Sequence, residues 1–489
     1  MDDILALDAT GQLAALAARQ VSAVELLAAA HRRYEAANPR VNAVVATDLD
    51  RARGRAQAID AKRRAGEALG PLAGLPMTIK DTFDVEGLPA SSGLEVFRRG
   101  DRPDAACVAL ARAAGAVIWG KTNTPVMAGD FQTFNALYGT TNNPWDVTRT
   151  PGGSSGGAAA ALALSITALE IGSDIGGSLR TPASFCGVYS HKPTWGVVSQ
   201  LGHIPPAPGS LAERDLNVVG PMARSARDLA LLFDVLSAAP PMSLASPALK
   251  ELRIGLWTEE PGLILDPQVK QAIEAFARRL EGAGARIEPV SAPADMAALL
   301  PAYRTLLAGV LAEDLPPAQL RQMQLIRPAA KLGLRFGASP DGWAGLAVDY
   351  AQSHLEWMAA NEVRAKAGAQ VRQLFERLDL ILAPVGPVAA FPHDHRPFQQ
   401  RTLTLSDGTK VPYLAALRWI ALATACGLPA TAIPAGMTPA KDGRGGLPVG
   451  AQLIGPRGGD WRTLAAAEAI EAALGGFVPP PEPATTLAA

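Results

Sequence analysis

The stretch that decides the fold reads Gly152-Gly153-Ser154-Ser155-Gly156-Gly157, then the apolar segment Ala158–Ile171, then Gly172-Ser173-Asp174-Ile175-Gly176-Gly177-Ser178-Leu179-Arg180. A single Gly/Ser loop is usually a linker, but two such loops around an apolar segment are hard to explain in that way. Glycine permits positive φ angles and a close approach of the backbone to a ligand. Consecutive backbone amides can also point at one spot, which is what a developing oxyanion requires.

Around this stretch, short apolar runs alternate with helical patterns, which predicts an α/β core. The expected strands are Met77–Ile79, Ala116–Trp119 and Ala168–Ile171, and the expected helices are Ala105–Ala114, Ala158–Ala163 and Ala226–Leu236. Before this stretch, we expect a helix over 10–36, with Ser22 as an N-cap, and a second helix over 51–68. After it, we expect a strand over 251–257, a helix over 267–283, mostly helix over 293–375 and a strand over Leu378–Ala383. Residues 384–412 are expected to be a loop, and 414–472 to contain strands and a helix.

The 489 residues would suggest about three domains by length alone. We expect one composite domain instead, because the helical middle section fits into a single core as well as it fits a separate unit. Its sections are N-terminal helices (1–70), a catalytic core (71–237), a more variable and largely helical section that begins with a connection at 238–250 (238–412), and a C-terminal part of the core (413–489).

Composition excludes several classes of protein. The 45 Lys+Arg against 46 Asp+Glu give a net charge of −1, which argues against a nucleic-acid binder held by phosphate contacts. The three cysteines lie far apart and form no CxxC pair, so neither a zinc site nor a disulfide framework is expected. We expect no signal peptide after Met1, and Ala158–Ile171 is too short to span a bilayer. These features predict a reduced, cytoplasmic protein that needs no metal or cofactor and no membrane.

Two tempting motifs fail on physical grounds. Residues 115–122 match GxxxxGK[ST], but the four intervening residues are strand-like and no helix is expected after Lys121, so a nucleotide loop is not predicted. Residues 152–156 match GxSxG, but a nucleophile elbow needs an apolar strand in front of it, and residues 143–151 are loop-like. None of the following histidines has a distinctive setting, and the pair His393 and His395 is expected to be solvated.

The remaining constellation resembles the amidase signature family. The resemblance covers most of the chain and is carried by Gly120-Lys121-Thr122-Asn123, Asn143-Pro144-Trp145, the two glycine–serine loops, Phe185-Cys186-Gly187, Lys192-Pro193-Thr194 and Gly427-Leu428-Pro429-Ala430, with Pro76-Met77-Thr78-Ile79-Lys80-Asp81 upstream. The resemblance implies an α/β fold in which a large mixed sheet is covered by helices on both sides. It also implies a Ser–Ser–Lys catalytic triad.

Carried over position by position, the resemblance makes Ser178 the nucleophile that forms an acyl-enzyme. Ser154 is then the bridging serine, at a cis peptide in the family, and Lys80 is the base. The implied oxyanion donors are the backbone amides of Ile175, Gly176, Gly177 and Ser178. The implied supporting residues are Ser173, where the family often has Thr, with Asp174, Arg180 and Ser155. The implied acyl-pocket residues are Ala128, Gly129, Asp130 and Phe131. Asp130 either selects a polar or cationic substrate or caps a turn.

These roles predict a hydrolase of small-molecule carboxylic amides, with esters also open as substrates. Lys80 would need burial to act as a base, because a lysine is otherwise protonated at pH 7; a surface ion pair with Asp81 or Asp84 is the alternative reading. His191 is expected to be structural. Specificity would come from 128–137, 200–215, 300–360 and 390–420, and a homodimer is left open.

Two other functions compete with this prediction. One is the glutaminase subunit of a tRNA-dependent amidotransferase, the multi-subunit branch of the family. The chain departs from that branch at Ser210–Asn217, where the branch carries a Ser-Leu-Asp-Gln type sequence, and at Ala128–Gln132, which lacks its Gly-Ser-Ser pattern. The other is a binding protein that keeps the fold without catalysis.

Overall fold

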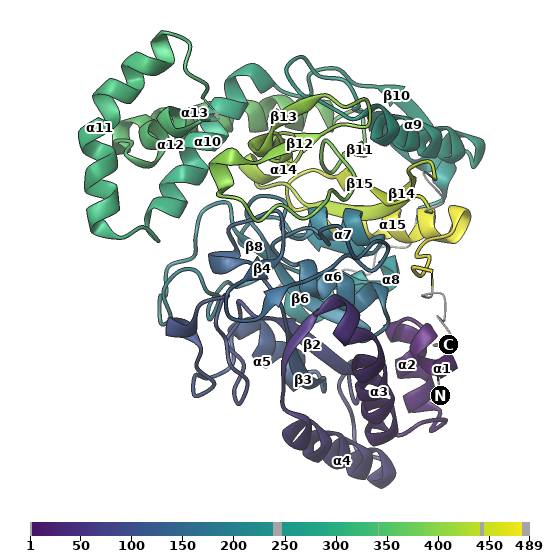
Figure 1. Cartoon of the computed structure of the whole chain (residues 1–489). Helices are drawn as coiled ribbons and strands as arrows, with labels where there is room; N and C mark the ends of the chain where they lie inside the picture. The colour runs from purple at the N-terminus through teal and green to yellow at the C-terminus, as the bar shows by residue number, and fades with distance from the viewer. Residues whose placement is uncertain (1, 238–246, 341, 441–444, 482–489) are drawn as a thin grey trace, which may run out of the picture.

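The computed structural model describes residues 2–237, 247–340, 342–440 and 445–481 (Figure 1). The first part of the expected connection at 238–250 therefore lies outside the described residues. One mixed sheet runs through the molecule. In spatial order its strands are β1 (Val44–Thr47), β3 (Val117–Thr122), β2 (Pro76–Lys80), β6 (Leu169–Asp174), β8 (Val218–Ala223), β7 (Tyr189–Lys192), β14 (Ala430–Met437), β15 (Pro448–Ile454), β11 (Leu380–Pro384), β9 (Arg253–Leu256) and β10 (Arg286–Pro289).

The sheet joins sections that lie far apart in the sequence. Strands β3, β2 and β6 are parallel neighbours, the strands from β6 to β11 pair antiparallel, and β11, β9 and β10 are parallel again. The section 238–412, expected to be largely helical, supplies three of these strands. The sheet is therefore continuous across these sections, and one composite domain stays a prediction.

Helices cover both faces of the sheet because both faces are apolar. In β11, Leu380 and Leu382 pack into one hydrophobic cluster, whereas Ile381 and Ala383 pack into the other. Such double-sided burial gives strands their continuous apolar runs. The first cluster contains residues of α5 (Ala106–Ala113), α8 (Ala226–Leu236), α9 (Pro267–Gly282) and α15 (Asp460–Leu474). The second contains residues of α6 (Gly156–Ala163), α7 (Arg180–Cys186), α10 (Met296–Ala312), α13 (His354–Leu374) and α14 (Ala421–Ala425).

The N-terminal section, predicted to consist of helices, differs from its prediction in two places, and the first is strand β1 (Val44–Thr47), which lies between two of the helices. The helix expected over 10–36 is two helices, α2 (Ala9–Ala17) and α3 (Ala23–Val41), separated at Arg19, whose φ is +58°. Ser22 is the N-cap of α3, as predicted, and it forms a capping box with Glu25. Helix α1 (Asp2–Ala6) precedes them and α4 (Leu49–Ala65) follows.

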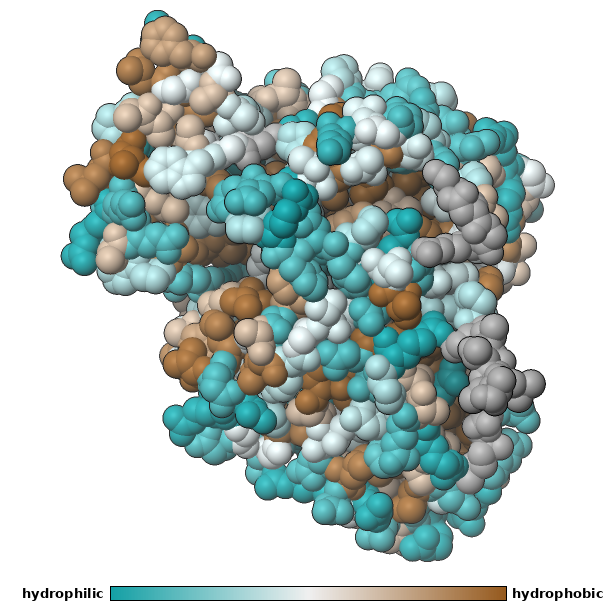
Figure 2. Space-filling model, viewed as in Figure 1, coloured by the Kyte–Doolittle hydropathy of each residue, from teal (hydrophilic) through white to brown (hydrophobic). Residues whose placement is uncertain are grey.

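The middle section contains the helices predicted over 293–375 and one pair of strands that was missed. Helices α11 (Pro317–Arg335) and α12 (Trp343–Tyr350) form a lobe with α10 and α13 at the upper left of Figure 1. Apolar side chains gather on this lobe in Figure 2, and Leu325 and Phe336 are among the exposed ones. Within the predicted loop 384–412, β12 (Thr402–Thr404) pairs with β13 (Lys410–Pro412). A second small pair is β4 (Phe134–Asn135) with β5 (Gly139–Thr140).

Candidate active site

The site begins where two parallel strands end. Lys80 is the last residue of β2, and Ser173 and Asp174 end its neighbour β6, with Ile79 of β2 paired to Ile171 of β6. Parallel strands bring their carboxyl ends to the same edge of a sheet. The Nζ of Lys80 therefore reaches Ser173 and donates a hydrogen bond to its Oγ at 3.0 Å. Lys80 is wholly buried, so the alternative of a surface ion pair is wrong.

The first glycine–serine loop brings Ser154 to this lysine. The Nζ of Lys80 donates to the Oγ of Ser154 at 2.7 Å, and the Gly153–Ser154 peptide is cis. A Cβ on Gly153 would lie 2.4 Å from the carbonyl oxygen of Asp130, so only glycine fits there. Helix α6 begins directly after the loop. Residues 141–155 contain no strand, which agrees with the rejection of a nucleophile elbow.

The second loop is held by a buried ion pair. The carboxylate of Asp174 accepts hydrogen bonds from the amides of Gly177 at 2.9 Å and Leu179 at 3.1 Å, and from the guanidinium of Arg180 at two positions of 3.0 Å. Arg180 is wholly buried and also donates to Gln452 at 2.9 Å. Asp174 and Arg180 thus brace the loop that carries Ser178, in the manner implied by the resemblance.

A backbone bond connects the two loops. The amide of Ser155 donates to the carbonyl oxygen of Ser178 at 3.2 Å, so Ser155 supports the site through its main chain. Its hydroxyl is buried and has no hydrogen-bond partner among the described residues. Ser154 and Ser178 both line the same pocket, together with Ser173.

Burial sets the electrostatics of the lysine. It lowers the pKa of Lys80 to about 7, against the opposing effect of Asp174 and Glu170. Burial raises the pKa of Glu170 to about 8, so this carboxyl is largely neutral at pH 7. Burial would also raise the pKa of Asp174, but Arg180 outweighs it and holds that pKa at about 2. Asp174, which stays charged near Lys80, is therefore already paired with a guanidinium.

Comparison with known proteins follows this geometry. The family model described as Amidase matches residues 25–464. The chain belongs to the amidase signature family. Its general reaction is therefore the hydrolysis of an amide bond.

Similar proteins span almost the full length of this amidase. The chain is 34% identical to a glutamyl-tRNA(Gln) amidotransferase subunit from Acidothermus cellulolyticus, over 97% of its own residues and 95% of that relative. Among solved structures, an amidase superposes with a TM-score of 0.77 at 28% identity, covering 95% of this chain and 99% of the other. A bacterial aryl acylamidase of the amidase signature family superposes with a TM-score of 0.77 at 25% identity, covering 96% of each chain.

The oxyanion prediction for this amidase needs one correction. The amide of Gly177 donates to Asp174, so it is not free to bind an oxyanion in this structure. The predicted donors that remain are the amides of Ile175, Gly176 and Ser178. The hydroxyl of Tyr303 on α10 donates to the carbonyl oxygen of Ile175 at 3.1 Å and fixes the start of this segment.

The pocket beside the serines has a volume of about 170 Å³. Its lining draws on all four regions predicted to govern specificity. The predicted residues Ala128, Gly129, Asp130 and Phe131 line it, together with Met127 in front of them. Helices α10 and α12 lie largely within the predicted region 300–360, and their apolar lining residues are Leu307, Ala308, Leu311 and Leu346.

The charged side chains that line the pocket have ionic partners, some within the lining and some outside it. Arg401 donates to Asp130, as does Tyr413 at 2.7 Å. On the helical side, Arg304 pairs with Asp349 at 2.6 Å. Arg214, also at the pocket, pairs with Asp314. The turn-capping reading of Asp130 holds, because its Oδ1 accepts a hydrogen bond from the amide of Gln132 at 3.3 Å, and the carboxylate is also paired with Arg401 from a distant loop.

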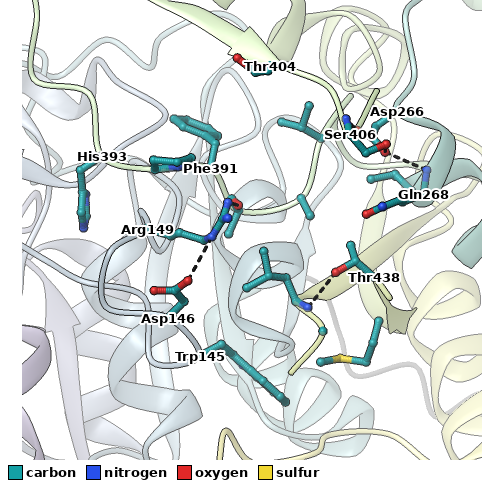
Figure 3. A pocket seen from close by; sticks show the side chains of 18 of the residues that line it. Trp145, Asp146, Arg149, Asp266, Gln268, Phe391, His393, Thr404, Ser406 and Thr438 are labelled. Carbon is teal, nitrogen blue, oxygen red and sulfur yellow. Dashed lines mark hydrogen bonds and ion pairs between the residues drawn. The ribbon is translucent and has the colours of Figure 1, made fainter. Parts of the chain in front are cut away.

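A larger hollow lies away from the serines (Figure 3). It has a volume of about 1650 Å³ and is lined by Trp145, Arg149, Asp266, Phe391 and His393 among others, but by none of the predicted catalytic residues. Arg149 pairs with Asp146 at 3.2 Å, and Asp266 caps α9 by accepting from the amide of Gln268 at 2.7 Å. The larger of these two cavities is therefore not the one lined by the predicted catalytic residues.

The rejected motifs have structural roles. Lys121 lies inside β3 and donates to the carbonyl oxygen of Phe83, so the sequence that resembles a phosphate loop is a buried strand. His191 contacts Thr431 at 2.9 Å and Asp460 at 3.2 Å, away from the pocket, as expected for a structural histidine. Within the described residues, no group of His, Cys, Asp and Glu is arranged to hold a metal ion. In the same part of the chain, no helix is both long and apolar enough to cross a membrane.

Proposed function

We propose that the chain hydrolyses carboxylic amides through an acyl-enzyme on Ser178. The supporting observation is that a buried lysine with a pKa of about 7 contacts Ser154 at 2.7 Å, next to the pocket that Ser178 lines. A serine hydroxyl is a poor nucleophile without a base. Neutral Lys80 accepts the proton of Ser154, Ser154 accepts the proton of Ser178, and the Ser178 oxygen attacks the carbonyl carbon.

The later steps use the same groups in reverse. The tetrahedral oxyanion accepts hydrogen bonds from the amides of Ile175, Gly176 and Ser178. When the carbon–nitrogen bond breaks, Lys80 returns its proton through Ser154 to the leaving amine. Water then attacks the acyl-enzyme with the same relay acting as base, and the carboxylic acid leaves Ser178 free.

The pocket supports an apolar acyl group. Leu307, Leu311 and Leu346 form its helical wall, and Asp130, Arg304 and Arg214 already have charged partners. Each charge of a zwitterionic substrate would need an unpaired pocket side chain of the opposite sign, because a buried charge without a partner is costly. We therefore infer aliphatic or aryl amides as the substrate class. The cytoplasm is the proposed location, since the three cysteines are buried and free.

A second candidate function is supported by the curated relatives. Proteins 34% identical to this chain over most of its length are named as subunits of a glutamyl-tRNA(Gln) amidotransferase. In that role the same triad would release ammonia from glutamine for a partner protein. The relatives favour this reading, and the paired charges of the pocket favour the first.

A substrate panel separates the two candidates. We expect kcat/KM for hexanamide or an anilide to exceed that for glutamine by at least about tenfold, the effect of about 1–3 kcal/mol of differential burial. Efficient glutamine hydrolysis, with co-purification of a second protein chain, would establish the second function instead. Ser178→Ala is the control for both, and undiminished turnover in that variant would refute the shared mechanism.

A further inference from the structure

A histidine that the sequence did not single out lies next to the catalytic lysine. His203 is in the loop between β7 and β8, and its ring packs edge-on against Phe83 with ring centroids 4.9 Å apart. Its backbone is fixed to the segment after β2, since the amide of Asp84 donates to Gly202 at 2.9 Å and the amide of Ile204 donates to Thr82 at 2.7 Å. His203 is 6% exposed.

The hydrogen bonds of this ring fix its tautomer. Nδ1 lies 2.7 Å from the carbonyl oxygen of Pro205, which can only accept, so Nδ1 carries the hydrogen. Burial, with the charge of Lys80 nearby, lowers the pKa of His203 to about 3, so the ring is neutral and Nε2 is an acceptor. The Oγ of Ser173 lies 2.8 Å from Nε2. The hydroxyl of Ser173 must therefore donate to His203.

This direction matters for Lys80. A neutral lysine amine has one lone pair, and the proposed function requires that this lone pair receive the proton of Ser154. The hydroxyl of Ser173, 3.0 Å from Nζ, can either accept from the amine or donate to its lone pair. In the second case it competes with Ser154. Because His203 takes the hydrogen of Ser173, Ser173 can only accept from Lys80.

We propose that His203 is a positioning residue that holds the hydroxyl hydrogen of Ser173 and so keeps the lone pair of Lys80 available to Ser154. The inference rests on the proposed function, because it assumes that Lys80 is the base. His203 itself touches no reacting atom in this role. It acts through Ser173.

The test replaces the acceptor with an apolar side chain. In His203→Leu, the hydroxyl of Ser173 is free to bind the lone pair of Lys80, so the plateau of kcat/KM falls by about tenfold, part of the 10²–10⁴ that a general base contributes. The hydrogen bond from the Ser173 hydroxyl to this lone pair stabilises only the neutral amine of Lys80. The acid limb of the pH profile therefore moves to lower pH, by about half a pH unit. The other titratable groups that act on Lys80 and His203 are Asp174, Glu170 and Arg214, and none of them is altered.

Two further variants make the test specific. His203→Gln keeps an acceptor near the position of Nε2 and retains kcat/KM within about threefold. His203→Asn, whose shorter side chain does not reach Ser173, behaves like His203→Leu and replaces it if the leucine variant does not fold. In a Ser173→Ala background the competing hydroxyl is gone, so adding His203→Leu lowers kcat/KM by less than about twofold. Such non-additivity is expected when His203 acts through Ser173.

The matched control is His191→Leu. This second buried histidine also contacts a hydroxyl, that of Thr431 at 2.9 Å, but lies away from the pocket. We expect it to lower the melting temperature and to leave the acid limb in place. The inference is overturned if His203→Leu leaves the acid limb unmoved, or if it costs the same factor in the Ser173→Ala background. If Ser178→Ala retains full turnover, the proposed function has failed and not merely the role of His203.

Discussion

The edge of the sheet that carries the serines and the wall of the pocket opposite it are held by different kinds of contact. At the edge, Lys80, Ser154 and Asp174 are fixed by hydrogen bonds of 2.7–3.0 Å where two strands end beside the glycine–serine loops. At the wall, the apolar side chains of Leu307 and Leu346 line the pocket from two separate helices, α10 and α12, that contact each other. Hydrogen bonds are directional and specify geometry, whereas apolar packing tolerates many residues of similar volume. We infer that the reaction depends on the edge and the choice of substrate on the wall.

The strongest test of this contrast removes the base at the edge. Lys80→Met keeps the length of the side chain but has no lone pair, so kcat/KM falls by about 10³-fold, within the range for loss of a general base. Steady-state turnover of the best amide measures it. Lys410→Met, an exposed lysine in β13, is the control and retains wild-type turnover. Turnover of Lys80→Met within tenfold of the wild type would place the base elsewhere.

The pH profile is the next largest effect. The pKa of Lys80 lies at about 7, and only its neutral form accepts a proton, so activity requires the lysine to be deprotonated. As pH falls below about 7, kcat/KM falls by about tenfold per pH unit; as pH rises above 7, it reaches a plateau. A profile of kcat/KM from pH 5 to 9 measures this limb. A maximum near pH 5 would be incompatible with Lys80 as the base.

The tight packing of the edge should make Gly153 intolerant of a larger side chain. In Gly153→Ala the new Cβ meets the carbonyl oxygen of Asp130 at 2.4 Å, so the backbone must shift, and we expect a loss of about 2 kcal/mol in the free energy of unfolding together with a large loss of turnover. Gly368→Ala in α13 is the matched control, because a Cβ there has no neighbour within 4 Å, and it should be neutral or stabilising. Urea unfolding of both variants checks this, and equal stabilities would contradict it.

The smallest expected effect is at the wall. Leu307→Ala enlarges the pocket and removes apolar contact with the acyl group, so KM for hexanamide rises by about three- to tenfold while kcat changes little. Leu325→Ala on the outer face of α11, where this leucine is 83% exposed, is the control. A fall in kcat without a change in KM would show that the wall also positions the reacting groups.

The same contrast explains what could be predicted from the sequence. Strands β2 and β6 are short, mainly apolar runs that end in Lys80 and Asp174, and the glycine–serine loops lie close to β6 in the sequence. The residues at this edge could therefore be predicted from the stretch 152–180 and the short upstream segment 76–81. Asp130 and Arg401 pair across 271 residues, and this contact depends on the packing of the whole chain. The break at Arg19 and the β12–β13 pair are also decided by tertiary contacts, which override local propensity.

His203 was missed for a related reason. No feature of the sequence around it distinguishes it from His191, and both are buried. What separates them is the partner of each ring, Ser173 at the edge of the sheet for one and Asp460 of α15 for the other. Only the three-dimensional contact of the loop 200–206 with the end of β2 reveals the difference.

In the proposed mechanism, Ser178 is the nucleophile and Lys80 is the base that activates it. Reaction of the purified chain with a fluorophosphonate, followed by peptide mass spectrometry, tests this directly. We expect one adduct, on Ser178, that is absent from Ser178→Ala and forms far more slowly in Lys80→Met. An adduct on another residue, or equal labelling rates in the wild type and Lys80→Met, would contradict this mechanism.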